Sequence, residues 1–169
     1  MLSGLKYFTY ILASGLVVFL LGNYIEVPNV NINNIQANVF EWEKQVEVYF
    51  PNITKGSNED CSRVFAVSRT IPNAETFGPG AITELLKGPS ARDKEAGFST
   101  SINTGVLLQK FDIRDRVAYV DFSSRLSQTG GSCMVESIRS QIETTLNSLP
   151  DIDSTTISVN GQTDGILEP

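Results

Sequence analysis

Histidine is absent from this chain, and cysteine occurs only twice, as Cys61 and Cys133. Histidine is the usual general base for a serine or cysteine nucleophile, so hydrolases of those types are disfavoured. The two cysteines lack CxxC spacing, and a zinc site would need two more soft ligands. Phosphate-loop and dinucleotide motifs are also missing, and residues 46–169 contain no S-x-x-K motif. The sequence therefore predicts no metal, no cofactor and no enzymatic activity.

Basic residues are scarce relative to acidic ones. The chain has 13 Lys and Arg against 19 Asp and Glu, and its formal net charge is -6. An acidic protein is repelled by phosphate backbones and by anionic lipid headgroups. Nucleic acid is therefore not expected as a partner.

A long apolar run opens the chain at residues 7–25, with Lys6 just ahead of it. About 19 residues at roughly 1.5 Å each give about 28 Å, close to the thickness of a bilayer core. The basic start predicts a cytoplasmic N-terminus and an exported remainder. A cleaved signal peptide is the alternative, but the exit of the run lacks a small-x-small cleavage site. Residues 1–25 are therefore predicted to be an uncleaved, single-pass transmembrane anchor.

The next segment, residues 26–45, is rich in Asn and has little periodicity, so we interpret it as a stalk. About 20 residues of such a linker give an r.m.s. reach of roughly 25 Å. Residues 46–169 then form one domain, long enough to bury a core without metals or dense disulfides.

The exported location bears on Cys61 and Cys133. An even pair of cysteines outside the reducing cytosol favours a disulfide over two buried thiols. A bridge between these two would close a loop of about 70 residues, and the chain-entropy model gives it roughly 4 kcal/mol of stabilisation.

Hydrophobic periodicity predicts the first half of the domain. Alternating apolar residues indicate strands at 46–50 and 64–69. A short amphipathic helix follows from Pro79 and ends at Gly88. Ser90 with Asp93 three residues later predicts a capped turn.

The second half continues with a predicted hairpin at 106–113 and 117–122. Apolar residues at steps of three and four then predict a helix over 135–149, and a last strand at 156–159 enters an Asn160-Gly161 turn. This order predicts an α+β fold, with a small, mostly antiparallel sheet covered by two helices on one face. The other face is left open to water or to a partner.

Three residues are candidate contacts on that open face. Arg69 and Asp121 are the charged residues with the most apolar surroundings, and Tyr119 lies in the same predicted strand as Asp121. A charge at a strand end commonly forms an ion pair or caps a helix. The alternative is that these residues mark a polar groove for a ligand or partner.

Two short segments carry a resemblance to a known family. They are Leu85-Leu86-Lys87-Gly88-Pro89 and Val120-Asp121-Phe122-Ser123, in that order and spacing. With the strands around them they resemble the GerMN domain, which occurs in sporulation and germination proteins and in many bacterial envelope proteins. The resemblance implies a domain similar to ring-building modules, no known catalysis, and binding to other envelope proteins. It also allows an oligomer.

We therefore expect a non-catalytic interaction module held on the outer face of a bacterial cytoplasmic membrane. The alternative is a receptor for a small cell-wall ligand, such as a glycan or peptide fragment, with Arg69 and Asp121 as polar contacts. An envelope enzyme is a third possibility and would need carboxylates that converge in a cleft.

Replacing Cys61 or Cys133 by Ser should lower the melting temperature of the oxidised protein, because the unfolded chain gains conformational entropy. The measurement is thermal unfolding of the wild type and both variants, with and without reductant. Equal melting of the wild type in both conditions would refute the bridge.

Overall fold

The computed structural model describes residues 43–72, 75–128 and 130–167. The predicted anchor at 1–25 and nearly all of the predicted stalk at 26–45 lie outside this part of the chain. Among the described residues, no helix is long and apolar enough to cross a membrane.

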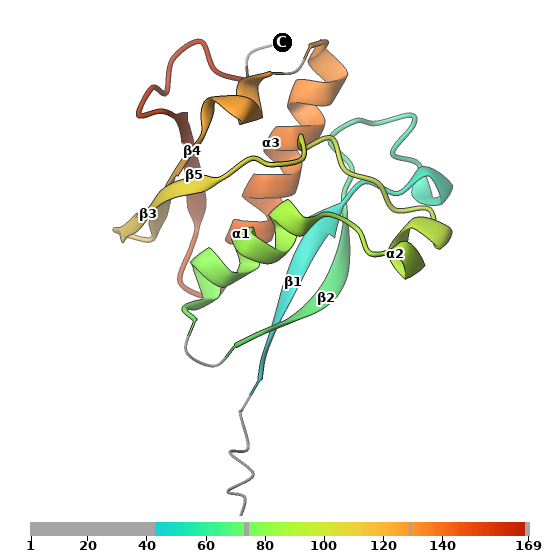
Figure 1. Cartoon of the computed structure of the whole chain (residues 1–169), viewed down its shortest axis with the longest axis horizontal. Coiled ribbons are helices and arrows are strands. Elements are labelled where there is room, and N and C mark those ends of the chain that lie inside the picture. Colours follow the sequence, from blue (N-terminus) through green and yellow to red (C-terminus); the bar gives the residue numbers. More distant parts are fainter. Residues whose placement is uncertain (1–42, 73–74, 129, 168–169) are drawn as a thin grey trace, which may run out of the picture. The chain divides into compact units, whose positions relative to one another are not determined.

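A two-stranded antiparallel sheet begins the domain (Figure 1). Strand β1 spans Lys44–Phe50 and β2 spans Phe65–Ile71. The inward-facing residues of β1 are buried, as the alternating pattern predicts: Val46, Val48 and Phe50. The loop between the strands contains a short 3-10 turn, η2, at Ile53–Lys55.

Two helices follow the first sheet. Helix α1 spans Phe77–Lys87 and ends at Gly88, whose φ of 75° few other residues adopt readily. Helix α2 spans Ala91–Glu95 and begins with the predicted capping box, in which Ser90 and Asp93 satisfy each other's backbone groups. Helix α2 has only five residues, so α1 provides most of the helical packing against the first sheet.

A three-stranded sheet with the order β3-β4-β5 forms the second half. Strands β3 (Leu108–Arg114) and β4 (Val117–Phe122) make the predicted hairpin. Its turn residues, Asp115 and Arg116, both have positive φ, as a type I′ turn requires. The remaining elements are η3 at Ser124–Ser127, α3 at Ser132–Asn147 and β5 at Ser154–Val159.

The α+β class is confirmed, and two of the three strand pairings are antiparallel as predicted, but the prediction of a single sheet is wrong. The described residues form two sheets, and β5 pairs with β4 in parallel. The reason is α3, since a helix that connects two adjacent strands carries the chain back before the second strand starts. Helices α1 and α3 contact each other, and each contacts strands of both sheets (Figure 1).

Helix α3 is buried along two sides. One side is the predicted apolar stripe, where Val135, Ile138, Ile142 and Leu146 are all buried. The other side is polar, and it is buried as well: Ser137, Gln141 and Thr145. The periodic pattern identified only the first of these two stripes.

Hydrogen bonds explain how the polar stripe of α3 tolerates burial. The Tyr49 backbone N–H donates to Thr145 Oγ1 at 3.0 Å, and Thr100 Oγ1 donates to Gln141 Oε1 at 2.8 Å. Ser101 Oγ also bonds Ser137 Oγ at 3.0 Å. The polar stripe therefore fixes α3 against β1 and the segment after α2, because buried polar groups without partners would be costly.

Helix α1 approaches β3 closely at Gly78. A Cβ atom at this buried glycine would overlap the ring of Phe111, which comes from the inner face of β3. A residue without a side chain is therefore needed at this point of the helix.

Replacing Gly78 by Ala should destabilise the protein by about 1–3 kcal/mol, because overpacking outweighs the usual helix-favouring effect of Ala. Urea unfolding provides the measurement. Gly130→Ala is the control, since a Cβ at Gly130 would meet nothing within 4 Å. Adding Phe111→Leu to the Gly78→Ala variant should recover part of the loss. An unchanged unfolding midpoint for Gly78→Ala would contradict the close contact.

Candidate interaction surface

The three-stranded sheet has one buried face and one open face. Ala118, Val120 and Phe122 of β4 are buried against the helices. The alternate residues of β4, with their partners on β3 and β5, form the surface that we call the open face. It consists of Lys110, Asp112, Arg114, Val117, Tyr119, Asp121, Ser154, Thr156 and Ser158.

Tyr119 is at the centre of the open face, between Asp112 on β3 and Thr156 on β5. Its side chain is 38% exposed. The Arg114 guanidinium lies 4.9 Å from the centre of the Tyr119 ring, and its Nε donates to Asp112 Oδ2 at 2.7 Å. The hydrogen bond from Arg114 lowers the pKa of Asp112. These three side chains form a charged and aromatic cluster on one stable hairpin.

Asp121 is on the same face, but it is held by the end of the neighbouring strand β5 and the turn after it. Its Oδ1 accepts hydrogen bonds from Ser158 Oγ and from the Gly161 backbone N–H, both at 2.7 Å. With the Gln109 amide turned so that its nitrogen faces the carboxylate, Gln109 donates to Oδ2 at 3.1 Å. Asp121 therefore orders the turn after β5, which is Asn160-Gly161 as predicted, with φ values of 49° and 79°.

Arg69 is not brought to this surface. It lies on β2 in the other sheet, where its guanidinium pairs with Asp93 of α2 and lies 6.0 Å from the Phe50 ring centre. Only 17% of the Arg69 side chain and 14% of the Asp93 side chain are exposed. The geometry of Arg69 is that of an internal ion pair that fastens α2 to the first sheet.

Asp93 is the ion-pair partner of Arg69, and this pairing was not predicted from the sequence. Its carboxylate also accepts hydrogen bonds from the Ser90 backbone N–H at 2.8 Å and Ser90 Oγ at 2.6 Å. Burial raises the pKa of Asp93, but the hydrogen bonds from Ser90 and the contact with Arg69 outweigh it, so the pKa is lowered. The Ser90-Asp93 spacing signalled the cap, whereas the pairing with Arg69 depends on the tertiary fold.

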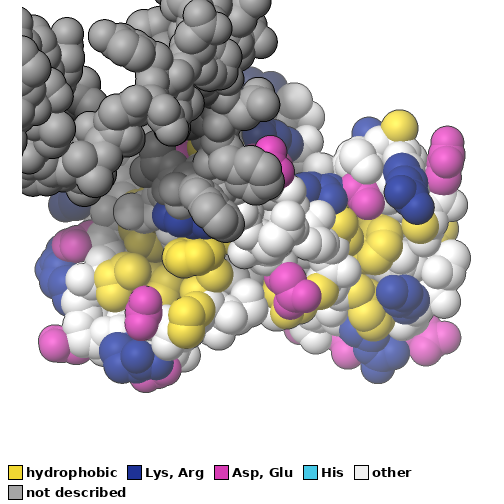
Figure 2. All heavy atoms as spheres, turned by 90° about the horizontal axis from the view of Figure 1, so that it is seen from below, with side chains coloured by type: hydrophobic (Ala, Val, Ile, Leu, Met, Phe, Trp, Pro, Cys, Tyr) yellow, Lys and Arg dark blue, Asp and Glu magenta, His cyan; other side chains and the backbone are white. Residues whose placement is uncertain are grey.

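A hollow of about 490 Å³ lies between β3, the start of α1 and the loop after α3. We call it the aromatic hollow, and its walls include Phe77, Pro79, Phe111, Ile113 and Pro150. Phe77 and Ile113 are 44% and 43% exposed. Figure 2, seen from below, shows hydrophobic side chains gathered in clusters with charged side chains around them.

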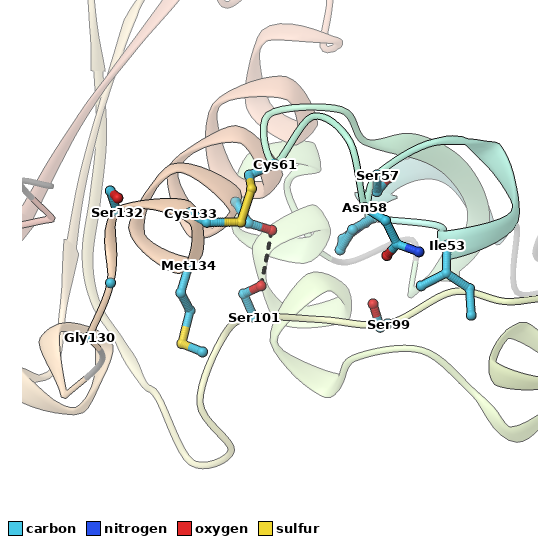
Figure 3. Close-up of a pocket in the computed structure, with 13 residues that line it drawn as sticks. Ile53, Ser57, Asn58, Cys61, Ser99, Ser101, Gly130, Ser132, Cys133 and Met134 are labelled. Carbon is cyan, nitrogen blue, oxygen red and sulfur yellow. Dashed lines mark hydrogen bonds between the residues drawn. A yellow bond between two sulfur atoms is a disulfide. The ribbon is translucent and has the colours of Figure 1, made fainter.

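A second hollow, of about 460 Å³, surrounds the Cys61–Cys133 disulfide (Figure 3). The two Cα atoms of the bridge are 5.3 Å apart, and the predicted disulfide is thereby confirmed. We call this the disulfide hollow, and Ile53, Ser99, Ser101 and Met134 also line it. None of Arg69, Tyr119 and Asp121 lines either hollow.

In the part of the chain that the structure describes, no group of three or more Cys, Asp and Glu side chains could hold a metal ion.

Replacing Asp93 by Asn should destabilise the protein by about 1–3 kcal/mol at pH 7, because Arg69 loses its charged partner. The contribution of Asp93 is complete above its unfolded-state pKa of about 3.9 and is lost as pH falls through the lower folded-state pKa. Urea unfolding at neutral and acid pH should show the difference between wild type and variant shrinking with acidity. A difference that stays constant down to pH 2 would contradict this assignment.

Both the sequence and the fold of this chain are similar to those of known proteins. A family model described as "Sporulation and spore germination", the Germane domain, matches residues 47–165. The spore germination protein GerM of Bacillus subtilis (strain 168) is 29% identical over 144 residues, which cover 82% of this chain and 37% of GerM. This chain thus spans little more than a third of the length of that relative.

Solved structures agree with this result. The tandem GerMN domains of B. subtilis GerM superpose with a TM-score of 0.55 at 27% identity, covering 81% of this chain and 43% of theirs. The first GerMN domain alone gives a TM-score of 0.50 at 18% identity, covering 71% of this chain and 85% of that domain, which supports the fold only. The family match spans most of the chain, and this protein belongs to the sporulation and spore germination (GerMN) domain family.

Proposed function

We propose that this protein is a non-catalytic interaction domain of the bacterial cell envelope, which binds another envelope protein through the open face of its three-stranded sheet. The observation that carries the proposal is the cluster of Tyr119, Arg114 and Asp112 on that face. Tyr and Arg are enriched among the residues that dominate the energy of protein interfaces.

The open face is suited to recognition because its side chains start from a rigid base. Ala118, Val120 and Phe122, which alternate with the exposed residues of β4, are at most 1% exposed. Arg114 donates to Asp112 and lies over the ring of Tyr119, so the three side chains are grouped together before a partner binds. Lys110 and Asp121 add charges of both signs in the neighbouring row.

The proposed location is the outer face of the cytoplasmic membrane, with residues 1–25 as a single-pass anchor. This part of the proposal depends on the apolar run and on Lys6, which lie outside the described residues. An anchor would raise the local concentration of the domain for membrane-bound partners. The disulfide is consistent with an oxidising compartment.

Absence of catalysis is proposed on chemical grounds. The chain has no histidine, and both cysteines are bonded to each other. The carboxylates on the open face are paired with Arg114 or with the turn after β5, so they do not converge on a substrate-sized cleft.

The aromatic hollow supports a second candidate function, a receptor for a small cell-wall ligand. Its volume of about 490 Å³ is in the range of small-molecule sites, and Phe77 and Phe111 would give a glycan ring or an apolar peptide side chain a surface to pack on. If the protein is such a receptor, Arg69 and Asp121 are not the ligand contacts, because neither lines the aromatic hollow.

Photocross-linking in intact cells tests the proposal. A photoreactive residue at Tyr119 should capture one defined envelope protein, whereas the same residue at Glu95, which is exposed on α2, should not. Tyr119→Ala should then weaken binding of the captured protein at least tenfold while the domain remains folded, as expected for an interface aromatic.

Two results would contradict the open face as the binding surface. One is equal capture from positions 119 and 95. The other is no captured protein at position 119 together with cell-wall fragments that copurify with the wild type and are lost in Phe77→Ala, which would establish the small-ligand receptor instead.

A further inference from the structure

The Cys61–Cys133 bridge is accessible, unlike a disulfide placed in a core. Both cysteines line the disulfide hollow, and Cys133 is among the exposed residues of the chain (Figure 3). A small thiol or the active-site loop of another protein could therefore reach the sulfur atoms without unfolding the domain. Exposed bridges of this kind are the ones that undergo exchange.

The surroundings of the two sulfurs differ. Cys133 is the second residue of α3, a 16-residue helix whose N-cap, Gly131, supplies no side-chain hydrogen bond. The residues that line the hollow are all uncharged, so no lining side chain opposes the positive end of the helix at Cys133. A thiolate at position 133 is stabilised by that end of the helix, which makes Cys133 the better leaving group of the pair.

Cys61 lies in the loop between η2 and β2. Apart from the disulfide, the side-chain hydrogen bonds of this loop are mainly internal to it. Ser57 Oγ donates to the Arg63 carbonyl at 2.6 Å, and Ser62 Oγ donates to Asp60 Oδ1 at 2.5 Å. At its base the Asn52 backbone N–H donates to Ser57 Oγ at 2.9 Å. The bridge is therefore the covalent fastening between this loop and α3.

Helix α3 has anchors that do not depend on the bridge. Its buried apolar stripe includes Ile138, Ile142 and Leu146, and its polar stripe is bonded to Tyr49 and Thr100. Breaking the disulfide would leave these contacts in place. The expected change is local and is confined to the loop over residues 56–64 and the first turn of α3.

We propose that the bridge is a site of thiol–disulfide exchange with a dithiol oxidoreductase, and that its reduction releases the 56–64 loop from α3. A thiolate of the oxidoreductase attacks Cys61 Sγ, the S–S bond breaks, and Cys133 leaves as a thiolate. The second thiol of the oxidoreductase then attacks the mixed disulfide, which frees Cys61. Two electrons pass to the domain, the two thiol protons are released or taken up by its sulfurs, and the oxidoreductase becomes a disulfide. This inference does not depend on what binds the open face.

The test reduces the native full chain with dithiothreitol and follows each cysteine by iodoacetamide alkylation and mass spectrometry. Reduction should proceed while the far-UV circular dichroism is unchanged. Cys133 should then be alkylated faster than Cys61 at neutral pH, and the midpoint of its pH-rate profile should lie below the value of about 8.5 for an ordinary thiol. The paired variants Cys61→Ser and Cys133→Ser, each with one thiol, provide the matched comparison.

Trypsin provides a second readout of the loop, since Lys55 and Arg63 are the cleavage sites that bound it. Cleavage at these residues should be slow in the oxidised protein and at least tenfold faster after reduction. The proposal is overturned if reduction requires denaturant, if it unfolds the whole domain, or if Cys61 reacts as fast as Cys133. Unchanged tryptic cleavage after complete reduction would refute release of the loop.

Discussion

The burial of α3 on two sides is the constraint on which the rest of this fold depends. Its apolar stripe contributes Ile138, Ile142 and Leu146 to the core, while its polar stripe bonds the edge of β1 through Thr145. The same helix connects β4 to β5 and so makes that strand pair parallel. One helix thereby joins two separate sheets into a single packed unit. Introducing a polar residue into the apolar stripe, or an apolar residue into the polar stripe, would disturb this packing.

This arrangement determines which surfaces are available to partners. The inner residues of β4 are buried in the core, so the hairpin presents only its alternate residues. Among these, Arg114 lies over the ring of Tyr119. The two charged residues that the sequence suggested as contacts serve the fold instead. Arg69 fastens α2 through Asp93, and Asp121 orders the turn after β5. The recognition surface that we propose is thus a consequence of how the core is packed, and it does not require a cleft.

Local signals in the sequence predicted most elements, because each has a local cause. The alternation in β1, the Ser90-Asp93 capping box and the Asn160-Gly161 turn are all encoded within a few residues. The division into two sheets was not predicted, because it depends on which strands α1 and α3 pack against. Likewise, the polar stripe of α3 and the Arg69–Asp93 pair join residues distant in the chain, and no periodicity reports such partners. For the candidate site, the sequence named Tyr119 and Asp121 but not the role of Arg114.

Lysine footprinting of the full chain tests the central claim most directly, since it needs no substitution. Lys110 lies on the open face, and Lys94 is exposed on α2 away from it. An amine-acylating reagent is applied to native envelopes and to the detergent-solubilised, purified protein. If the open face binds a partner in the envelope, Lys110 should be protected there relative to the purified protein while Lys94 reacts equally in both. Equal labelling of Lys110 in both preparations would contradict the account.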